Sequence, residues 1–181
     1  TLFDTLAAMK STLTVAPKPL LRGHFHQAAF FFALGACAML VAKCREPDFI
    51  FPVLIYSLSL CGLFGVSALY HRAQWNQKSR LWMRRLDHSF IFILIAGTST
   101  PVCQLALSKA NGFKILTIVW IAACLGILQS LFWAKAPKWL SAVLYITIGW
   151  LVVPYLPEFR SSLGFANATL LLLGGVFYTV G

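Results

Sequence analysis

Three polar side chains beside two long apolar stretches have the types and spacing that suit chemistry. Ser67 and His71 lie four residues apart at the end of one apolar stretch, and Asp87 opens the next. Residues four apart share one face of a helix. We expect the polar stretch of 15 residues between His71 and Asp87 to form a loop, which returns the chain to the side it left. We therefore expect these three side chains to converge at a similar depth, near one end of a helical bundle.

An imidazole, a carboxylate and a hydroxyl together suit metal-assisted hydrolysis. Histidine is a usual zinc ligand, and an open zinc site lowers the pKa of bound water to about 7. A carboxylate orients a ligand or accepts a proton, and a hydroxyl donates to a developing oxyanion. In the structural alternative, Asp87 caps its helix and pairs with Arg84 or Arg85, His71 is an interfacial histidine, and Ser67 is a packing hydroxyl. Spacing alone leaves both interpretations open.

The remaining histidines give weaker signals. His24 and His26 are two residues apart, so on a helix they point about 200° apart and do not easily share one metal ion. We expect His24 to anchor at a membrane interface, and the sequence leaves the position of His26 open. His88 follows Asp87 directly and is expected to serve ordinary packing.

Composition identifies the elements that must position these residues. Of 181 residues, 59% are apolar and 11% are charged, against about 45–50% and about 25% in soluble domains. The apolar runs have the length that a helix needs to cross a hydrocarbon core of about 30 Å. Helices also satisfy their own backbone hydrogen bonds in lipid. The sequence therefore predicts an all-α, polytopic transmembrane helical bundle.

Polar or proline-containing breaks divide the chain into a basic lead-in and six expected spans. The lead-in is residues 1–23, and the transmembrane domain, 24–181, has spans at about 25–42, 49–71, 88–107, 115–133, 139–155 and 165–181. Ten Lys and Arg residues fall on the N-terminal side of the membrane and five on the other. Basic residues favour the cytoplasmic side. We therefore expect a cytoplasmic N-terminus and a multi-pass location in the cell (inner or plasma) membrane.

The net charge of +10 raises the question of nucleic acid binding. The basic residues are spread between apolar runs, and they form no basic domain or stripe of the kind that contacts phosphates. We therefore expect membrane lipids, and no nucleic acid, as partners.

Four motifs follow one another in a fixed order. The first is S-x-x-x-H, here Ser67 to His71, and the second is Arg85-Leu86-Asp87-His88-Ser89. The third is Ala96-Gly97-Thr98-Ser99-Thr100-Pro101, and the fourth is Gly174-Gly175-Val176-Phe177-Tyr178-Thr179-Val180-Gly181. Over roughly residues 20–181, this set resembles the hemolysin III family, the bacterial branch of the progestin and adipoQ receptor superfamily, which includes the adiponectin receptors.

The resemblance implies a seven-span protein that is similar to zinc-dependent membrane hydrolases acting on an amide or ester bond of a lipid. In such proteins three histidines hold the zinc, and His71 matches one of them. The other two belong to an H-x-x-x-H motif in the seventh span, while Asp87 and Ser67 match the remaining polar set. This sequence contains six of the expected seven spans and no H-x-x-x-H. We therefore expect the chain by itself to bind zinc poorly, whether it is a fragment or a true truncation.

Two other functions stay open beside hydrolysis. The family name implies a membrane-lytic or pore-forming protein, although continuous integral spans give no support to a secreted toxin. A receptor or membrane-homeostasis factor without catalysis is the third possibility. The sequence therefore does not decide whether the chain is an enzyme.

Overall fold

The computed structural model describes residues 20–133 and 136–181, and every regular element in these ranges is helical. The helices are α2 (Leu20–Lys43), α3 (Pro47–Arg72), α4 (Gln77–Ala106), α5 (Lys109–Phe132), α6 (Lys138–Gly149) and α7 (Leu156–Val180), with a short 3₁₀ helix at Val153–Tyr155. The predicted all-α fold class is confirmed. The first 19 residues of the predicted lead-in lie outside the described residues.

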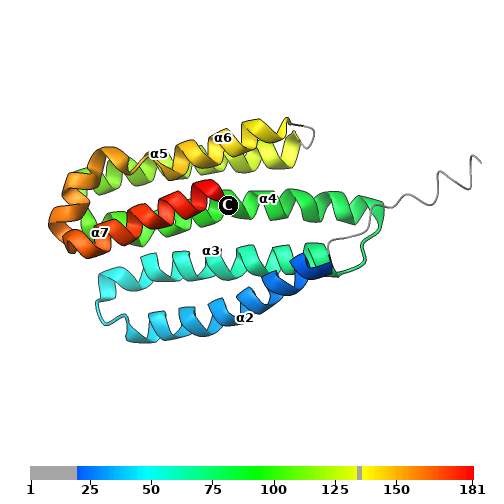
Figure 1. Ribbon diagram of the computed structural model, residues 1–181, viewed down its shortest axis with the longest axis horizontal. Helices are drawn as coiled ribbons and strands as arrows, with labels where there is room; N and C mark the ends of the chain where they lie inside the picture. The colour runs from blue at the N-terminus through cyan, green and yellow to red at the C-terminus, as the bar shows by residue number, and fades with distance from the viewer. Residues whose placement is uncertain (1–19, 134–135) are drawn as a thin grey trace, which may run out of the picture.

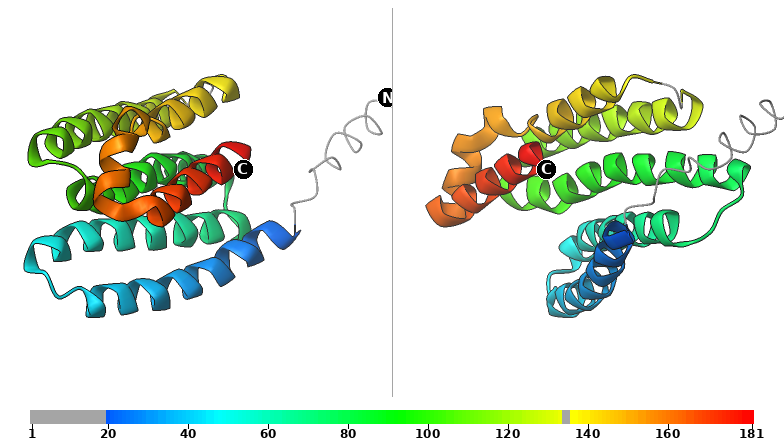
Figure 2. Two further views of the ribbon diagram at one scale, coloured as in Figure 1. Left: turned by 60° about the vertical axis from the view of Figure 1, so that its left-hand side comes forward. Right: turned by 45° about the vertical axis from the view of Figure 1, so that its right-hand side comes forward.

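Helices α2 to α5 lie side by side in chain order, each antiparallel to the one before (Figure 1). Helix α6 returns along α5, and α7 turns back beside α4 (Figure 2). The bundle therefore has two ends. At the α3–α4 end, on the right in Figure 1, α3 ends and α4 begins. At the α4–α5 end, on the left, α4 ends and α5 begins.

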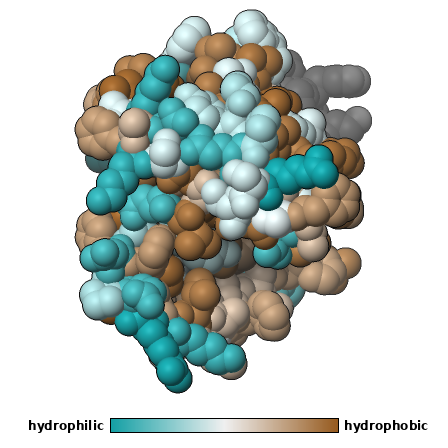
Figure 3. All heavy atoms as spheres, turned by 90° about the vertical axis from the view of Figure 1, so that its left-hand side faces the viewer, coloured by the Kyte–Doolittle hydropathy of each residue, from teal (hydrophilic) through white to brown (hydrophobic). Residues whose placement is uncertain are grey.

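The outer surface of the bundle is apolar. Five stretches of the described residues are long and apolar enough to cross a membrane, namely 23–43, 47–72, 77–106, 109–132 and 139–180, the last of which contains both α6 and α7. Phe32 and Phe132 are each 80% exposed, which a monomer in water does not tolerate over large areas. Hydrophilic side chains gather on the α4–α5 end of the bundle, with apolar ones around them (Figure 3). These features identify a multi-pass membrane protein.

Helix α4 begins at Gln77, eleven residues before the predicted span, which was expected to start at residue 88. The connection after α3 is only four residues long, and Asn76 caps α4 by accepting a hydrogen bond from the backbone N–H of Ser79 at 2.8 Å. Residues 77–86 contain no Gly or Pro and several good helix formers, so the helix extends through their charges. The prediction of a polar loop over 72–86 is therefore wrong.

Helix α5 also begins earlier than predicted, at Lys109 rather than Ile115. The dipeptide Asn111-Gly112, a residue pair typical of turns, lies inside the first turns of this helix, because Ser108 caps the helix and accepts from the backbone N–H of Asn111 at 3.4 Å. Gly112 serves close packing instead, since a Cβ there would lie 3.2 Å from the carbonyl oxygen of Cys103 on α4.

A carboxylate fastens the start of α7 to the α4–α5 connection. Glu158 accepts hydrogen bonds from the backbone N–H of Ser108 at 2.5 Å and from the side-chain amide of Asn111 at 2.7 Å. These donors, first that backbone N–H, hold the pKa of the Glu158 carboxyl below its usual range.

The fifth predicted span is shorter than expected, and the sixth is preceded by a short helical segment and a kink. Helix α6 ends at Gly149, six residues before the predicted end of its span, and the 3₁₀ helix around Pro154 follows. Helix α7 is interrupted at Gly164, whose φ of 78° and ψ of 166° lie outside the helical region. Glycine adopts such a positive φ without steric cost. The long second half of α7 therefore begins at Phe165, where the sixth span was predicted to start.

The core lies between α4, α5 and α6. The ring of Phe92 is fully buried, packs on Tyr145 of α6 with centroids 4.5 Å apart, and occupies the space where a Cβ of Gly126 on α5 would stand. This packing fixes the orientation of α4, and with it the faces that α4 presents to α3 and α7.

Candidate functional site

A close contact between α3 and α4 sets their register. A Cβ at Gly97 would overlap the hydroxyl of Ser59, so the two helices touch at that level. From there towards the α3–α4 end, Asp87 lies ten residues along α4 and His71 twelve residues along α3. At 1.5 Å per residue these are about 15 Å and about 18 Å. The two residues therefore lie at depths within about 3 Å of each other.

Ser67 lies one helical turn from His71 on α3, nearer the middle of the bundle. Its side chain is buried, at 4% exposure, whereas His71 is half-buried. The depth of Asp87 falls between those of Ser67 and His71 by the same helical rise. The structure thus places the three predicted residues on two adjacent helices, over little more than one turn.

The structure does not show Asp87 as a helix cap that pairs with an arginine. Asn76 caps α4, and Asp87 lies well inside the helix. Within residues 20–133 and 136–181, its carboxylate makes no ion pair with Arg84 or Arg85, and the Nδ1 atom of His88 lies 3.9 Å from it. The Arg85 guanidinium instead lies over the Trp82 ring, 4.8 Å from its centroid. The Asp87 side chain, 17% exposed, therefore has a carboxylate available for chemistry.

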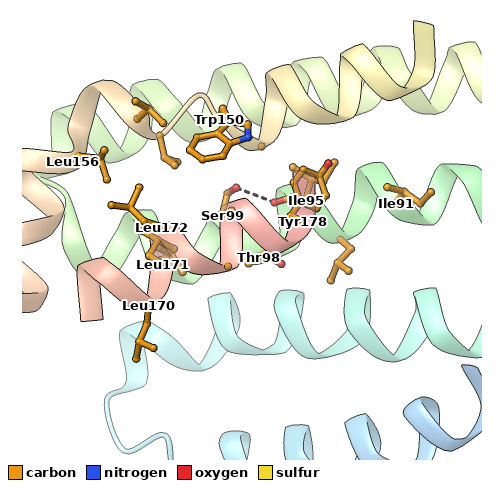
Figure 4. Close-up of a pocket in the computed structure, with 17 residues that line it drawn as sticks. Ile91, Ile95, Thr98, Ser99, Trp150, Leu156, Leu170, Leu171, Leu172 and Tyr178 are labelled. Atoms are coloured by element: carbon orange, nitrogen blue, oxygen red, sulfur yellow. Dashed lines mark hydrogen bonds between the residues drawn. The ribbon is translucent and has the colours of Figure 1, made fainter. Parts of the chain in front are cut away.

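The face of α4 that carries Asp87 continues into a cavity. Ile91, Leu94 and Thr98 follow Asp87 at spacings of four, seven and eleven residues and so share its face. These three line a cavity of about 380 Å³ between α4, the end of α6 and α7. Its walls are mostly apolar (Figure 4). Asp87 therefore lies one helical turn beyond an apolar cavity, on the same side of α4.

Two polar groups of the cavity wall, those of Ser99 and Trp150, are already engaged within the bundle. The Ser99 hydroxyl donates to the backbone carbonyl of Ile95 at 2.8 Å, and the Trp150 indole N–H donates to the Thr179 hydroxyl at 2.8 Å. A cavity of this character suits a hydrocarbon chain better than a polar ligand.

A second histidine joins the site from α2. The ring centroids of His26 and His71 lie 5.8 Å apart, and the Phe64 ring meets His26 edge-on at 6.2 Å. Gly23 permits this approach, because a Cβ there would lie 3.2 Å from the Cβ of His71. The sequence left the position of His26 open. The three-residue spacing of Gly23 and His26, which places both on one helix face, was the available signal.

The other two histidines lie apart from this group. His24 is exposed, as an interfacial residue would be. The Nδ1 atom of His88 lies 2.8 Å from the Arg84 carbonyl oxygen, and the backbone carbonyl of His88 accepts a hydrogen bond from the Tyr145 hydroxyl at 3.3 Å. His88 therefore holds α4 against α6.

The residues present do not complete a zinc site. In the part of the chain that the structure describes, no group of three His, Cys, Asp or Glu side chains is placed to hold a metal ion. A catalytic zinc takes three protein ligands and a structural zinc four. The two neighbouring imidazoles of His26 and His71 fall short of either set, so no chemical step here is assigned to a metal.

Comparison with known proteins gives consistent matches. The family described as "Haemolysin-III related" matches residues 14–181. The chain is 37% identical over 127 residues to "Hemolysin-3 homolog" of Bacillus subtilis (strain 168), which covers 70% of this chain and 59% of that protein. It is 34% identical over 127 residues to "Hemolysin-3" of Bacillus cereus, covering 70% of this chain and 58% of that protein. The chain thus matches about three fifths of the length of these curated relatives.

A more distant likeness extends to animals. The chain is 25% identical over 134 residues to human "Monocyte to macrophage differentiation factor", covering 70% of this chain and 54% of that protein. No solved structure matches the chain.

Proposed function

Because the chain belongs to the haemolysin-III family of membrane proteins, we propose that it crosses the cell membrane six times with a cytoplasmic N-terminus. The antiparallel course of α6 and α7 supports two crossings within the last apolar stretch (Figure 1). The basic residues near the α3–α4 end support a cytoplasmic position for that end.

The function that the site supports best is hydrolysis of an amide or ester bond in a membrane lipid. One observation carries this proposal: the Asp87 carboxylate has no arginine partner among the described residues, and it lies beside an apolar cavity at the depth of His71. The cavity would hold the acyl chain of the lipid. The scissile carbonyl, at the polar end of that acyl chain, would then lie near Asp87.

Each residue then has a chemical role. Asp87 accepts the proton of the attacking water, which makes it the general base, and returns that proton to the leaving amine or alcohol as the bond from the carbonyl carbon to that group breaks. The Ser67 hydroxyl donates to the oxygen that becomes negative as the carbonyl is attacked. In the whole protein a zinc ion would supply a more acidic bound water, with His71 as one of its ligands. Zinc therefore stays a proposed cofactor of the whole protein.

The test is lipid turnover by the full-length protein in liposomes of its native lipids. We expect release of free fatty acid, which Asp87→Asn lowers by at least a hundredfold and Ser67→Ala by about tenfold to a hundredfold. Asp48→Asn, which changes an exposed carboxylate at the opposite end, is the matched control. Unchanged turnover in a folded Asp87→Asn protein would exclude the proposed role.

Membrane lysis is the second candidate, because the Bacillus cereus relative carries the name "Hemolysin-3". Lysis predicts that the purified protein releases a trapped dye from liposomes and that Asp87→Asn releases it equally. A receptor without catalysis instead predicts lipid binding in the cavity, no turnover and no dye release.

A further inference from the structure

Helix α4 is longer than a membrane crossing requires. Its 30 residues span about 45 Å, whereas the hydrocarbon core is about 30 Å thick. Residues 87–106, the last twenty, are enough to cross that core. The first ten residues, 77–86, therefore lie at and beyond the headgroup layer, as a rigid helix instead of the loop that the sequence predicted.

The charged residues of this projecting segment and of the connection before it are all basic. Residues 72–86 contain five basic residues and no acidic one. Arg85 is half-buried and the other four are exposed. Arg72 donates a hydrogen bond to Gln27, and we call the remaining three, Lys78, Arg80 and Arg84, the basic surface. The α4–α5 end differs, because its five basic residues are interspersed with three acidic ones, Glu46, Asp48 and Glu158. The basic residues are Lys43, Arg45, Lys109, Lys114 and Arg160.

Apolar side chains accompany the basic surface. Leu81 and Trp82 are each 50% exposed and Leu86 is 38% exposed. Tryptophan favours the membrane–water interface, so these residues place the segment at headgroup depth. The Arg85 guanidinium lies over the Trp82 ring, and thus Arg85 serves packing while the basic surface stays open.

We propose that the basic surface binds the headgroups of anionic phospholipids in the surrounding bilayer. A lipid phosphate at this depth would accept charge-assisted hydrogen bonds from the arginines, and the exposed Trp82 and Leu81 would rest on the upper acyl chains. Each basic residue near an anionic bilayer contributes about fivefold to binding. This binding is independent of lipid hydrolysis, since none of the three residues belongs to the site of Asp87.

The experiment uses the full-length protein in phosphatidylcholine nanodiscs, with fluorescent phosphatidylglycerol as the probe. We expect Lys78→Gln/Arg80→Gln/Arg84→Gln to weaken binding of the probe by at least tenfold, and high salt to weaken binding to the unchanged protein. The matched control, Lys43→Gln/Arg45→Gln/Lys109→Gln, removes the same charge from the opposite end and should keep the affinity. Equal loss in both variants, or loss in neither, overturns the proposal.

Two further measurements keep the outcome decisive. If the triple variant does not fold, Arg84→Gln alone should weaken binding of the probe by about fivefold. Arg84→Lys, which keeps the charge, should keep the affinity. An unchanged affinity in Arg84→Gln overturns the proposal. Water-soluble glycerol phosphate should not displace the probe, because the apolar contacts require a bilayer lipid. Displacement at equal concentration would assign the surface to free phosphate and overturn the membrane assignment.

Discussion

The imidazole rings of His26 and His71 lie 5.8 Å apart between centroids, although the two residues are 45 positions apart in the chain. The contact joins the start of α2 to the end of α3, and it occurs where Gly23 brings the two helices close together. His26 is thus placed beside His71, the residue that we propose as a zinc ligand of the whole protein.

Zinc content tests this relationship. In the full-length protein we expect His71→Ala to abolish stoichiometric zinc, because a direct ligand is lost. His26→Ala should weaken zinc affinity by about tenfold or more, as the loss of a supporting residue does. His24→Ala is the control, since His24 is exposed and two residues away. Zinc measured by mass spectrometry during chelator titration gives the result, and equal affinities for the His24 and His26 variants would remove His26 from the site.

The contact of Gly97 with Ser59 can be tested through stability. Gly97→Ala places a methyl group against the Ser59 hydroxyl, and such overpacking costs about 1–3 kcal/mol. Gly35→Ala should instead be neutral or stabilising by about 0.5–1 kcal/mol, because no atom lies within 4 Å of its added methyl. Unfolding in detergent followed by circular dichroism compares the two. A Gly97→Ala protein as stable as Gly35→Ala would show that the register is not set by this contact.

Low pH should break the hydrogen bonds from Ser108 and Asn111 to Glu158, a contact that we call the Glu158 clamp. The pKa of Glu158 is lowered by hydrogen bonds from Ser108 and Asn111, so the ionised form is favoured in the folded protein. The resulting stability is fully present above the usual glutamate pKa, and it disappears as pH falls through the lowered pKa. We expect Glu158→Gln to lower the Tm at pH 7 and to leave it nearly unchanged at the acid limit.

The matched control for this clamp is Glu46→Gln, at an exposed carboxylate of the same end. It should not change the pH dependence of the Tm. A pH profile that is the same for Glu158→Gln and for the unchanged protein would argue against the clamp.

Filling the cavity beside α4 with a larger side chain should lower lipid turnover. Thr98→Phe introduces a ring into the cavity wall, so we expect lipid turnover to fall while the protein stays folded. Leu105→Phe is the control, because Leu105 lies seven residues further along the same helix face, is 59% exposed and does not line the cavity. Turnover measured with lipids of increasing chain length would separate the two, since the filled cavity should reject long chains first. Equal rates in both variants would exclude the cavity as the acyl site.

The sequence predicted the apolar helices and the shared depth of His71 and Asp87, because both follow from chain reversal between long apolar runs. It misplaced the start of α4, because charged residues were interpreted as a loop although they are good helix formers behind an Asn76 cap. Because the predicted span began next to Asp87, the sequence also allowed Asp87 as the cap of that helix. The contact of His26 with His71 was not predictable from hydropathy, since it depends on which face α2 turns towards α3.

The break at Gly164 divides α7 into two parts with different attachments. The first part is held at the α4–α5 end by Glu158, while the second part, with Leu170, Leu171 and Gly175, forms a wall of the cavity. A change of φ and ψ at this one glycine would swing the second part as a hinge does and leave the Glu158 hydrogen bonds intact. Rotating half of one helix would thus move one wall of the cavity relative to α4 and change how far the cavity opens towards the surrounding bilayer.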